Sequence, residues 1–285
     1  MNIFNTWLLN LFLYLICVTA FYQFYKLAVK NAKNDGAATI MLQLIAGIVV
    51  LALAPLFRLQ FPTDPKIYLL LAVACIFYAL NDRLQTTARK HLEVSTVSII
   101  NQLLTVMLIF YGIVFFKDPV VPTKILGAFI IVCANILLFV KGNKLRLNRH
   151  AIIAFIATAA LATALSIDIG ISKQFNLPIY NSITFLLPAL FIMTGERVSV
   201  KTTLEELRSP SKKYFYITGI LWALVIFFYL RAFQFGEITT IVPLSATNVI
   251  LSVIAAYIFL KERDDRIKKL IAAILVVIGI YLTVL

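Results

Sequence analysis

The sequence predicts an all-α integral membrane protein with ten transmembrane helices that form two inverted five-helix repeats. Three observations predict this fold class. The chain has 285 residues, of which 61% are hydrophobic and only 14% are charged, whereas soluble domains are about half apolar and a quarter charged. The apolar residues fall in long blocks without a polar face, which is typical of helices surrounded by lipid. A repeat inside the chain relates its two halves.

The ten helices are predicted from apolar blocks, most of which reach the roughly 20 residues needed to cross about 30 Å of hydrocarbon. We expect the spans near residues 6–28, 37–57, 67–89, 94–116, 123–140, 151–172, 177–194, 214–235, 238–260 and 267–284. The first cation of the chain is Lys26, so the first block lacks the charged start of a signal peptide and is expected to be a true helix.

The third span contains a polar stretch, Asn81, Asp82 and Arg83, which decides where its helix ends. The uncharged run before this stretch is too short to cross a membrane alone. The internal repeat aligns the stretch with residues 225–227, which lie inside an apolar span. We therefore expect the helix to continue to about residue 89, with an amide, an acid and a base at membrane depth. The alternative is an early helix end, with Asp82 and Arg83 snorkelling to the headgroups.

The repeat itself appears when residues 77–140 are aligned without a gap on residues 221–284. Charged and polar matches at one offset are hard to obtain from apolar bias, and these are Glu93–Glu237, Thr96–Thr240, Lys117–Lys261, Asp118–Glu262 and Lys124–Lys268. We expect a first five-helix repeat in residues 1–145 and a second in residues 146–285. Because five is odd, the two repeats enter the membrane with opposite orientation, as in many secondary transporters with a site at the repeat interface.

Several function classes find no support in the sequence. The net charge of +13 does not indicate nucleic-acid binding, because the cations lie in short loops beside the spans. Cys17, Cys75 and Cys133 lie inside spans, no CxxC occurs, and His91 and His150 lie at span edges, so neither a disulfide nor a metal site is predicted. The chain contains no HExxH, GxSxG or P-loop motif, so we expect no enzyme and no cofactor.

The segment GEITTIVPLSATNVILSVIAAYIFLKERDDRIKKLIAAILVVIGIYL at 236–282 resembles the last two helices of the drug/metabolite transporter superfamily. The first half holds a weaker copy that begins LEVSTVSIINQLL, in which Ile99 stands where the second half has Pro243. With ten helices in two halves, the whole chain resembles the ten-helix EamA-like branch. This resemblance implies a central cavity between the halves, lined mainly by helices 1, 3, 4, 6, 8 and 9, and transport of small organic solutes.

Polar residues recur at helical spacing on one face of the fourth span and on one face of the ninth. They are Ser98, Asn101, Gln102 and Thr105 in the fourth span and Ser245, Asn248 and Ser252 in the ninth. Each residue alone fits hydrogen bonding between helices equally well, but the amides as a group are expected to line the cavity. The aromatic residues Tyr78 and Trp222 occupy equivalent repeat positions, although Tyr and Trp also anchor spans at membrane interfaces.

The predicted substrate-binding residues are Tyr78, Asn81, Asp82, Asn101, Gln102, Trp222, Ser245 and Asn248. Asp82 and Arg83 are predicted to form a coupling or charge pair, and Pro243 to bend the ninth helix as a gate, with ordinary kinking as the alternative. Asp168, late in the sixth span, is expected at the interface. TLEE at 203–206 fits a capping box and predicts a short surface helix.

The predicted function is secondary transport, as an exporter or exchanger, of a small polar or amphipathic organic metabolite by alternating access. A flippase for a lipid-linked sugar or phosphate, an integral-membrane enzyme and a scaffold remain alternatives. Expected partners are a small-molecule substrate and membrane lipids but no nucleic acid, for a monomer or homodimer in the plasma membrane. Most Lys and Arg follow odd-numbered spans; the positive-inside rule then places both termini outside, whereas the family resemblance implies termini inside.

Overall fold

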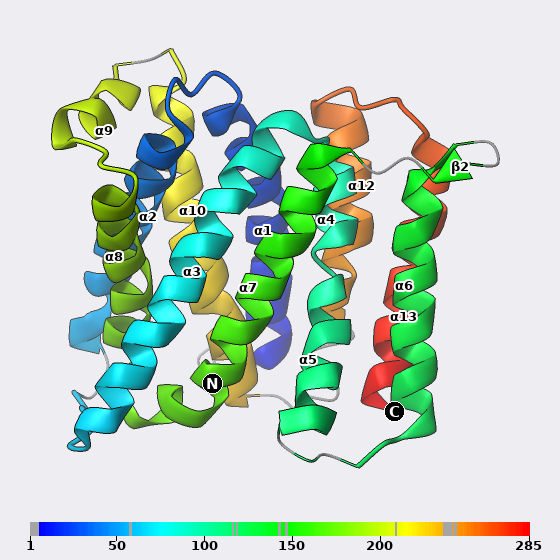
Figure 1. Cartoon of the computed structure of the whole chain (residues 1–285), viewed down its shortest axis with the longest axis horizontal. Coiled ribbons are helices and arrows are strands. Elements are labelled where there is room, and N and C mark those ends of the chain that lie inside the picture. Colours follow the sequence, from blue (N-terminus) through cyan, green and yellow to red (C-terminus); the bar gives the residue numbers. More distant parts are fainter. Residues whose placement is uncertain are drawn as a thin grey trace. The chain divides into compact units, whose positions relative to one another are not determined.

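The computed structural model describes residues 6–56, 59–115, 117, 119–141, 144–145, 148–208, 210–235, 241 and 244–285. These residues are predominantly helical, as predicted, with loops between the helices and a two-stranded pairing of β1 (Val140–Lys141) with β2 (Lys144–Leu145) (Figure 1). The chain forms two compact units, residues 1–23, 91–155 and 225–285 in the first and residues 24–90 and 156–224 in the second. Each unit therefore takes helices from both halves of the sequence. The boundary at 145/146 between the two repeats stays a prediction.

The second unit is built around a long contact between α2 (Asp35–Leu51) and α8 (Leu177–Gly195). It also contains η2 (Ala54–Leu56), η3 (Ser172–Gln174) and α9 (Val200–Glu206). The helix α3 (Pro65–His91) belongs to this unit as far as Lys90. The end of α1 (Trp7–Val29), most of α7 (Arg149–Ile171) and the first half of α10 (Lys212–Phe235) complete it. Side chains of Asn34 and Asn176 cap α2 and α8 by accepting backbone N–H groups of their first turns.

The first unit centres on the pairing of α6 (Pro122–Phe139) with α13 (Arg266–Val284), on which α12 (Asn248–Phe259) and α4 (Val94–Ile100) pack. Two glycines let the backbones of α6 and α13 approach closely. A Cβ atom on Gly127 would lie 2.4 Å from the carbonyl oxygen of Gly279, and one on Gly279 would lie 2.8 Å from that of Gly127. Small residues at such crossings are typical of membrane helix pairs.

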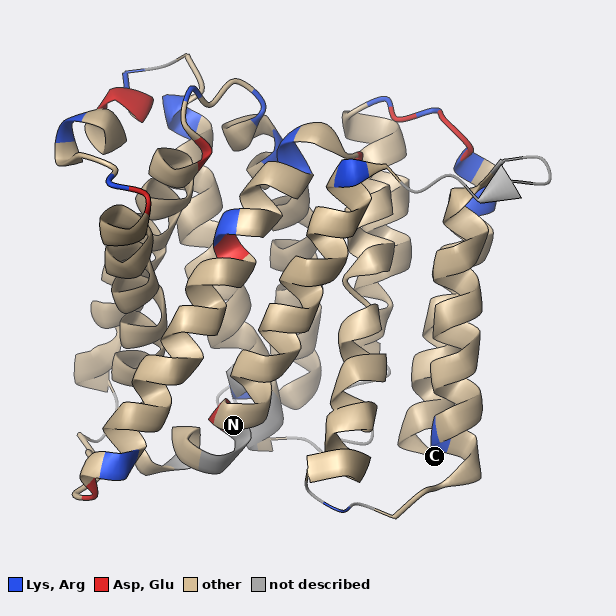
Figure 2. Cartoon of the chain, in the orientation of Figure 1, with Lys and Arg blue, Asp and Glu red and all other residues tan. Residues whose placement is uncertain are grey.

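Nine helical segments of the described chain are long and apolar enough to cross a membrane, where α2 with η2 and α4 with α5 (Leu103–Phe115) each count as one segment. The ninth predicted span is represented by a shorter apolar helix, Leu244–Phe259, and its predicted beginning lies outside the described residues. Figure 2 shows charged residues mainly at helix ends and in loops, with an adjacent acid and base part-way along α3. Those two residues are Asp82 and Arg83.

The fourth predicted span differs from expectation because its helix is interrupted. α4 ends at Ile100 and α5 (Leu103–Phe115) begins after a turn at Asn101 and Gln102. In this turn the Gln102 N–H donates to the Ile99 carbonyl at 3.1 Å, a three-residue spacing tighter than that of an α-helix. The predicted polar face of residues 94–116 is therefore broken at the two amides.

Candidate functional site

The structure confirms that α3 continues through the polar stretch, because the helix runs from Pro65 to His91. The early helix end, with Asp82 at the headgroups, is therefore wrong. Asn81 and Asp82 are each only 5% exposed, so the amide and the acid are buried between helices.

Asp82 is held by two neutral amides. Its Oδ2 accepts a hydrogen bond from Gln43 Nε2 of α2 at 2.7 Å, and its Oδ1 accepts one from Asn81 Nδ2 at 2.7 Å. The Gln43 side chain is fully buried. Neither Gln43 Oε1 nor Asn81 Oδ1 has a hydrogen-bond partner among the described residues. The site thus presents a carboxylate flanked by two amide oxygens, which is a set of hydrogen-bond acceptors suited to a positively charged group.

Arg83 does not supply that positive charge. Its Nε donates to Glu196 Oε1 at 2.6 Å and its guanidinium also donates to Thr87 Oγ1 at 2.6 Å. The predicted charge pair of Asp82 with Arg83 is not found among the described contacts, because adjacent residues on a helix do not face one another. The positive charge of Arg89, two turns further along α3, attracts the Asp82 carboxylate. Its guanidinium lies 4.9 Å from the centre of the Tyr25 ring.

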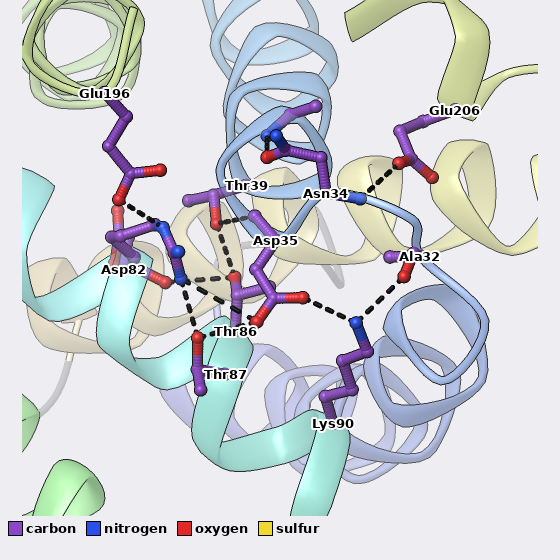
Figure 3. Close-up of polar contacts among 12 residues, drawn as sticks. Ala32, Asn34, Asp35, Thr39, Asp82, Thr86, Thr87, Lys90, Glu196 and Glu206 are labelled. Carbon is purple, nitrogen blue, oxygen red and sulfur yellow. Dashed lines mark hydrogen bonds and ion pairs between the residues drawn. The ribbon is translucent and has the colours of Figure 1, made fainter. Parts of the chain in front are cut away.

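A cluster of charged residues fastens the end of α3 to the beginning of α2 (Figure 3). Lys90 Nζ donates to Asp35 Oδ1 at 2.7 Å and to the Ala32 carbonyl at 2.8 Å. Glu206, at the end of α9, accepts the backbone N–H groups of Lys33 and Asn34 at 3.0 and 2.9 Å. These contacts satisfy backbone donors that precede α2 and fix the helix ends around the buried site.

The hydroxyl of Thr86 in the same unit links α3 to α2 and to α1. Thr86 Oγ1 receives a hydrogen bond from Thr39 of α2 at 2.7 Å and pairs with the Tyr25 hydroxyl at 2.9 Å. Thr86 also donates to the Asp82 carbonyl oxygen, four residues before it, at 3.0 Å. The turn of α3 that carries Asp82 is therefore anchored on both neighbouring helices.

A second acid of this unit, on α7, lies beside the middle of α3. Asp168 of α7 accepts hydrogen bonds from the hydroxyls of Tyr78 in α3 and Tyr180 in α8. The predicted site residue Tyr78 therefore uses its hydroxyl to bind a residue that the sequence placed at the interface. Trp222, the other predicted aromatic, packs in this unit against Phe185 with ring centres 4.9 Å apart.

The other predicted site residues lie in the first unit. Ser245 and Asn248 are each 6% exposed, and Asn248 Nδ2 donates to the Tyr14 hydroxyl at 3.2 Å. Asn101 and Gln102 are half-buried at the turn between α4 and α5. Pro243 lies outside the described residues, so its role as a gate stays a prediction.

The predicted residues thus fall into two groups, one in each unit. Tyr78, Asn81, Asp82 and Trp222 belong to the second unit, and Asn101, Gln102, Ser245 and Asn248 belong to the first. A common cavity for both groups stays a prediction. The interpretation of the sequence missed Gln43, although a single amide in an apolar span is itself a signal of a buried polar contact.

The sequence pattern of the EamA-like transporter family matches residues 5–140 and, a second time, residues 148–285. A search of curated proteins finds no match. One solved protein structure is similar over 96% of this chain and 94% of that chain, with 13% sequence identity and a TM-score of 0.57. At this identity the similarity concerns the fold alone. The two family matches together cover nearly the whole chain.

Proposed function

The chain belongs to the EamA-like transporter family, and on this premise we propose that it carries a small organic cation, such as an amine, across the membrane by alternating access. It is an integral multi-pass membrane protein that transports small substrates. The proposal adds the charge of the substrate and the mode of transport, which is exchange against a proton. We place the protein in the plasma membrane, as a monomer or homodimer.

The observation that carries the proposal is the buried Asp82 carboxylate with two neutral amide partners. Burying a carboxylate is unfavourable unless its charge is compensated. Its hydrogen-bond partners are neutral amides and Arg89 attracts it, so we infer that a proton or a bound cation completes the neutralisation. Arg83 is engaged with Glu196 and Thr87 instead. A substrate cation and a proton would then compete for the same two oxygens, and such competition is the simplest basis for exchange.

The charge at this site also separates the proposal from its main alternative. A flippase for a lipid-linked phosphate would need cationic groups around its cargo. The Asp82 carboxylate itself repels a phosphate, and its two hydrogen-bond partners, Gln43 and Asn81, are neutral amides and not cations.

The test is transport into liposomes that contain the purified protein. Radiolabelled solutes are offered in three sets, cationic amines, neutral solutes and organic anions, with and without a proton gradient. We expect uptake of one or more amines that depends on the gradient. In Asp82→Asn, which keeps the shape of the side chain, we expect at least a tenfold loss, about 1.4 kcal/mol.

The matched control is Asp64→Asn, which removes the same charge from an exposed residue just before α3. This control should transport at the rate of the unmodified protein. Uptake of anions or neutral solutes alone, or full transport by a well-folded Asp82→Asn variant, would refute the assignment.

A further inference from the structure

A basic pocket lies in the first compact unit, where the end of α6 meets the beginning of α13. Its volume is 430 Å³. Three cations, Arg263, Arg266 and Lys268, contribute to its wall, with Asp265 as the single acid. The pocket therefore has an excess of positive charge, and it is formed by residues separate from those around Asp82.

Two of the three cations are held in place by contacts that leave donors available. Lys268 Nζ donates to the carbonyl oxygens of Leu138 and Val140 at 3.2 and 2.5 Å, at the end of α6. Arg266 donates to the Tyr257 hydroxyl at 2.9 Å. Arginine has five N–H donors and lysine three. Arg263 is exposed, and no described contact occupies its guanidinium. The pocket thus offers several charged donors to an anion.

The rest of the pocket is apolar and opens onto a stripe along α13. Leu137, Ile267 and Ile271 line it. Ile267 is 69% exposed and Ile271 47% exposed, and the row continues with Ile274 and Ile278 at 43% and 46%. These positions share one face of the helix, and at 1.5 Å per residue the row is roughly 16 Å long. An acyl chain has a comparable length, and in a membrane this exposed row faces lipid.

We propose that the basic pocket binds the headgroup of an anionic phospholipid, whose acyl chain lies along the isoleucine row of α13. Charge complementarity selects the phosphate and an anionic headgroup, since basic pockets on membrane helices attract anionic lipids. The apolar row selects a lipid over a soluble anion. The site binds a lipid that stays in the bilayer, so it does not depend on which solute is transported.

The test is native mass spectrometry of the purified full chain in detergent micelles. Phosphatidylglycerol and phosphatidylcholine with the same acyl chains are titrated, and inorganic phosphate is added in large excess in a parallel series. We expect binding of phosphatidylglycerol to exceed that of phosphatidylcholine by roughly tenfold or more. The reason is that phosphatidylglycerol carries a net negative charge, which the three cations of the pocket attract, whereas phosphatidylcholine carries none. Excess phosphate should displace little of it.

The variant Arg263→Gln/Arg266→Gln/Lys268→Gln should reduce this preference to roughly twofold or less. The matched control Lys201→Gln/Lys212→Gln/Lys213→Gln removes three exposed cations from the second unit and should keep the full preference. Because Arg266 and Lys268 make contacts within the fold, the single variant Arg263→Glu is measured as well and should lower the preference without a change in thermal stability.

Three results would overturn the proposal. Equal binding of the two lipids would show ordinary lipid contact. An unchanged preference in both pocket variants would place the anionic lipid elsewhere. Displacement of phosphatidylglycerol by inorganic phosphate would identify a site for a soluble anion.

Discussion

Replacing Gly127 by alanine should force α6 away from α13 and destabilise the first compact unit. The added Cβ atom would lie 2.4 Å from the Gly279 carbonyl oxygen and 2.6 Å from Thr283 Cγ2. Since the nearest obstacle is backbone, no side-chain rotation relieves the contact. Ordinary contact begins at 3.4 Å, so the two backbones must separate by about 1 Å, which is the kind of shift that overpacking causes.

The magnitude follows from two opposing effects. Alanine in place of glycine inside a helix favours folding by roughly 0.5–1 kcal/mol. Overpacking of a tight contact opposes it by about 1–3 kcal/mol. The second effect is larger, so we expect a net loss of about 1–2 kcal/mol for Gly127→Ala. The melting temperature of the purified protein in detergent should fall by several degrees.

The control for this prediction is Gly195→Ala at the end of α8, where an added Cβ atom has no neighbour within 4 Å. This variant should melt at or above the temperature of the unmodified protein. If Gly127→Ala is as stable as Gly195→Ala, the close approach of α6 and α13 is not what the structure indicates, and the reasoning fails.

Three further variants probe the second unit. Gln43→Leu removes a donor from Asp82; we expect at least a tenfold change in the apparent affinity for a transported amine, measured by its uptake at varied concentration, and an unchanged affinity would contradict the site. Tyr180→Phe removes one of two hydroxyl donors to Asp168 and should cost about 1 kcal/mol in thermal unfolding, whereas no loss would show that the bond is dispensable. Glu206→Gln keeps an acceptor for two backbone N–H groups, so its stability should stay within about 1 kcal/mol, while Glu206→Ala should lose about 2 kcal/mol or more; equal losses would argue against these hydrogen bonds.

The length of α3 was predictable because the repeat supplied an internal comparison for Asn81, Asp82 and Arg83. The direction of these side chains was not predicted. An acid and a base adjacent in sequence suggest an ion pair, but neighbouring residues of a helix point in different directions. Arg83 therefore binds Glu196, while Asp82 faces Gln43. Polar residues recur every four positions along α2 at Asp35, Thr39 and Gln43, and along α3 at Asp82, Thr86 and Lys90. The structure pairs these two rows. This helical spacing was a signal for the partner of Asp82 that the interpretation of the sequence did not use.

Local signals were informative about elements and less so about their boundaries. The TLEE motif predicted the short helix α9, but this helix begins at Val200 and is capped by Ser199, whose hydroxyl accepts the Thr202 N–H. No glycine or proline near Ile100 predicts the interruption of the helix after this residue. α4 packs against α12 and α13, and these contacts belong to the assembled unit, so a reading of the local sequence does not show them.

The exchange of helices between the two halves of the sequence has a consequence for biosynthesis. α2 must wait for α8, which follows more than a hundred residues later, and α6 must wait for α13, which emerges last. Contacts this distant in sequence form slowly. α2 therefore remains in the bilayer without α8 until about residue 195 has been made, whereas α6 remains without α13 until the ribosome has nearly finished. Gln43 and Asp82 both lie on early helices, so their hydrogen bond can form first and satisfy two polar groups before the rest of the second unit arrives.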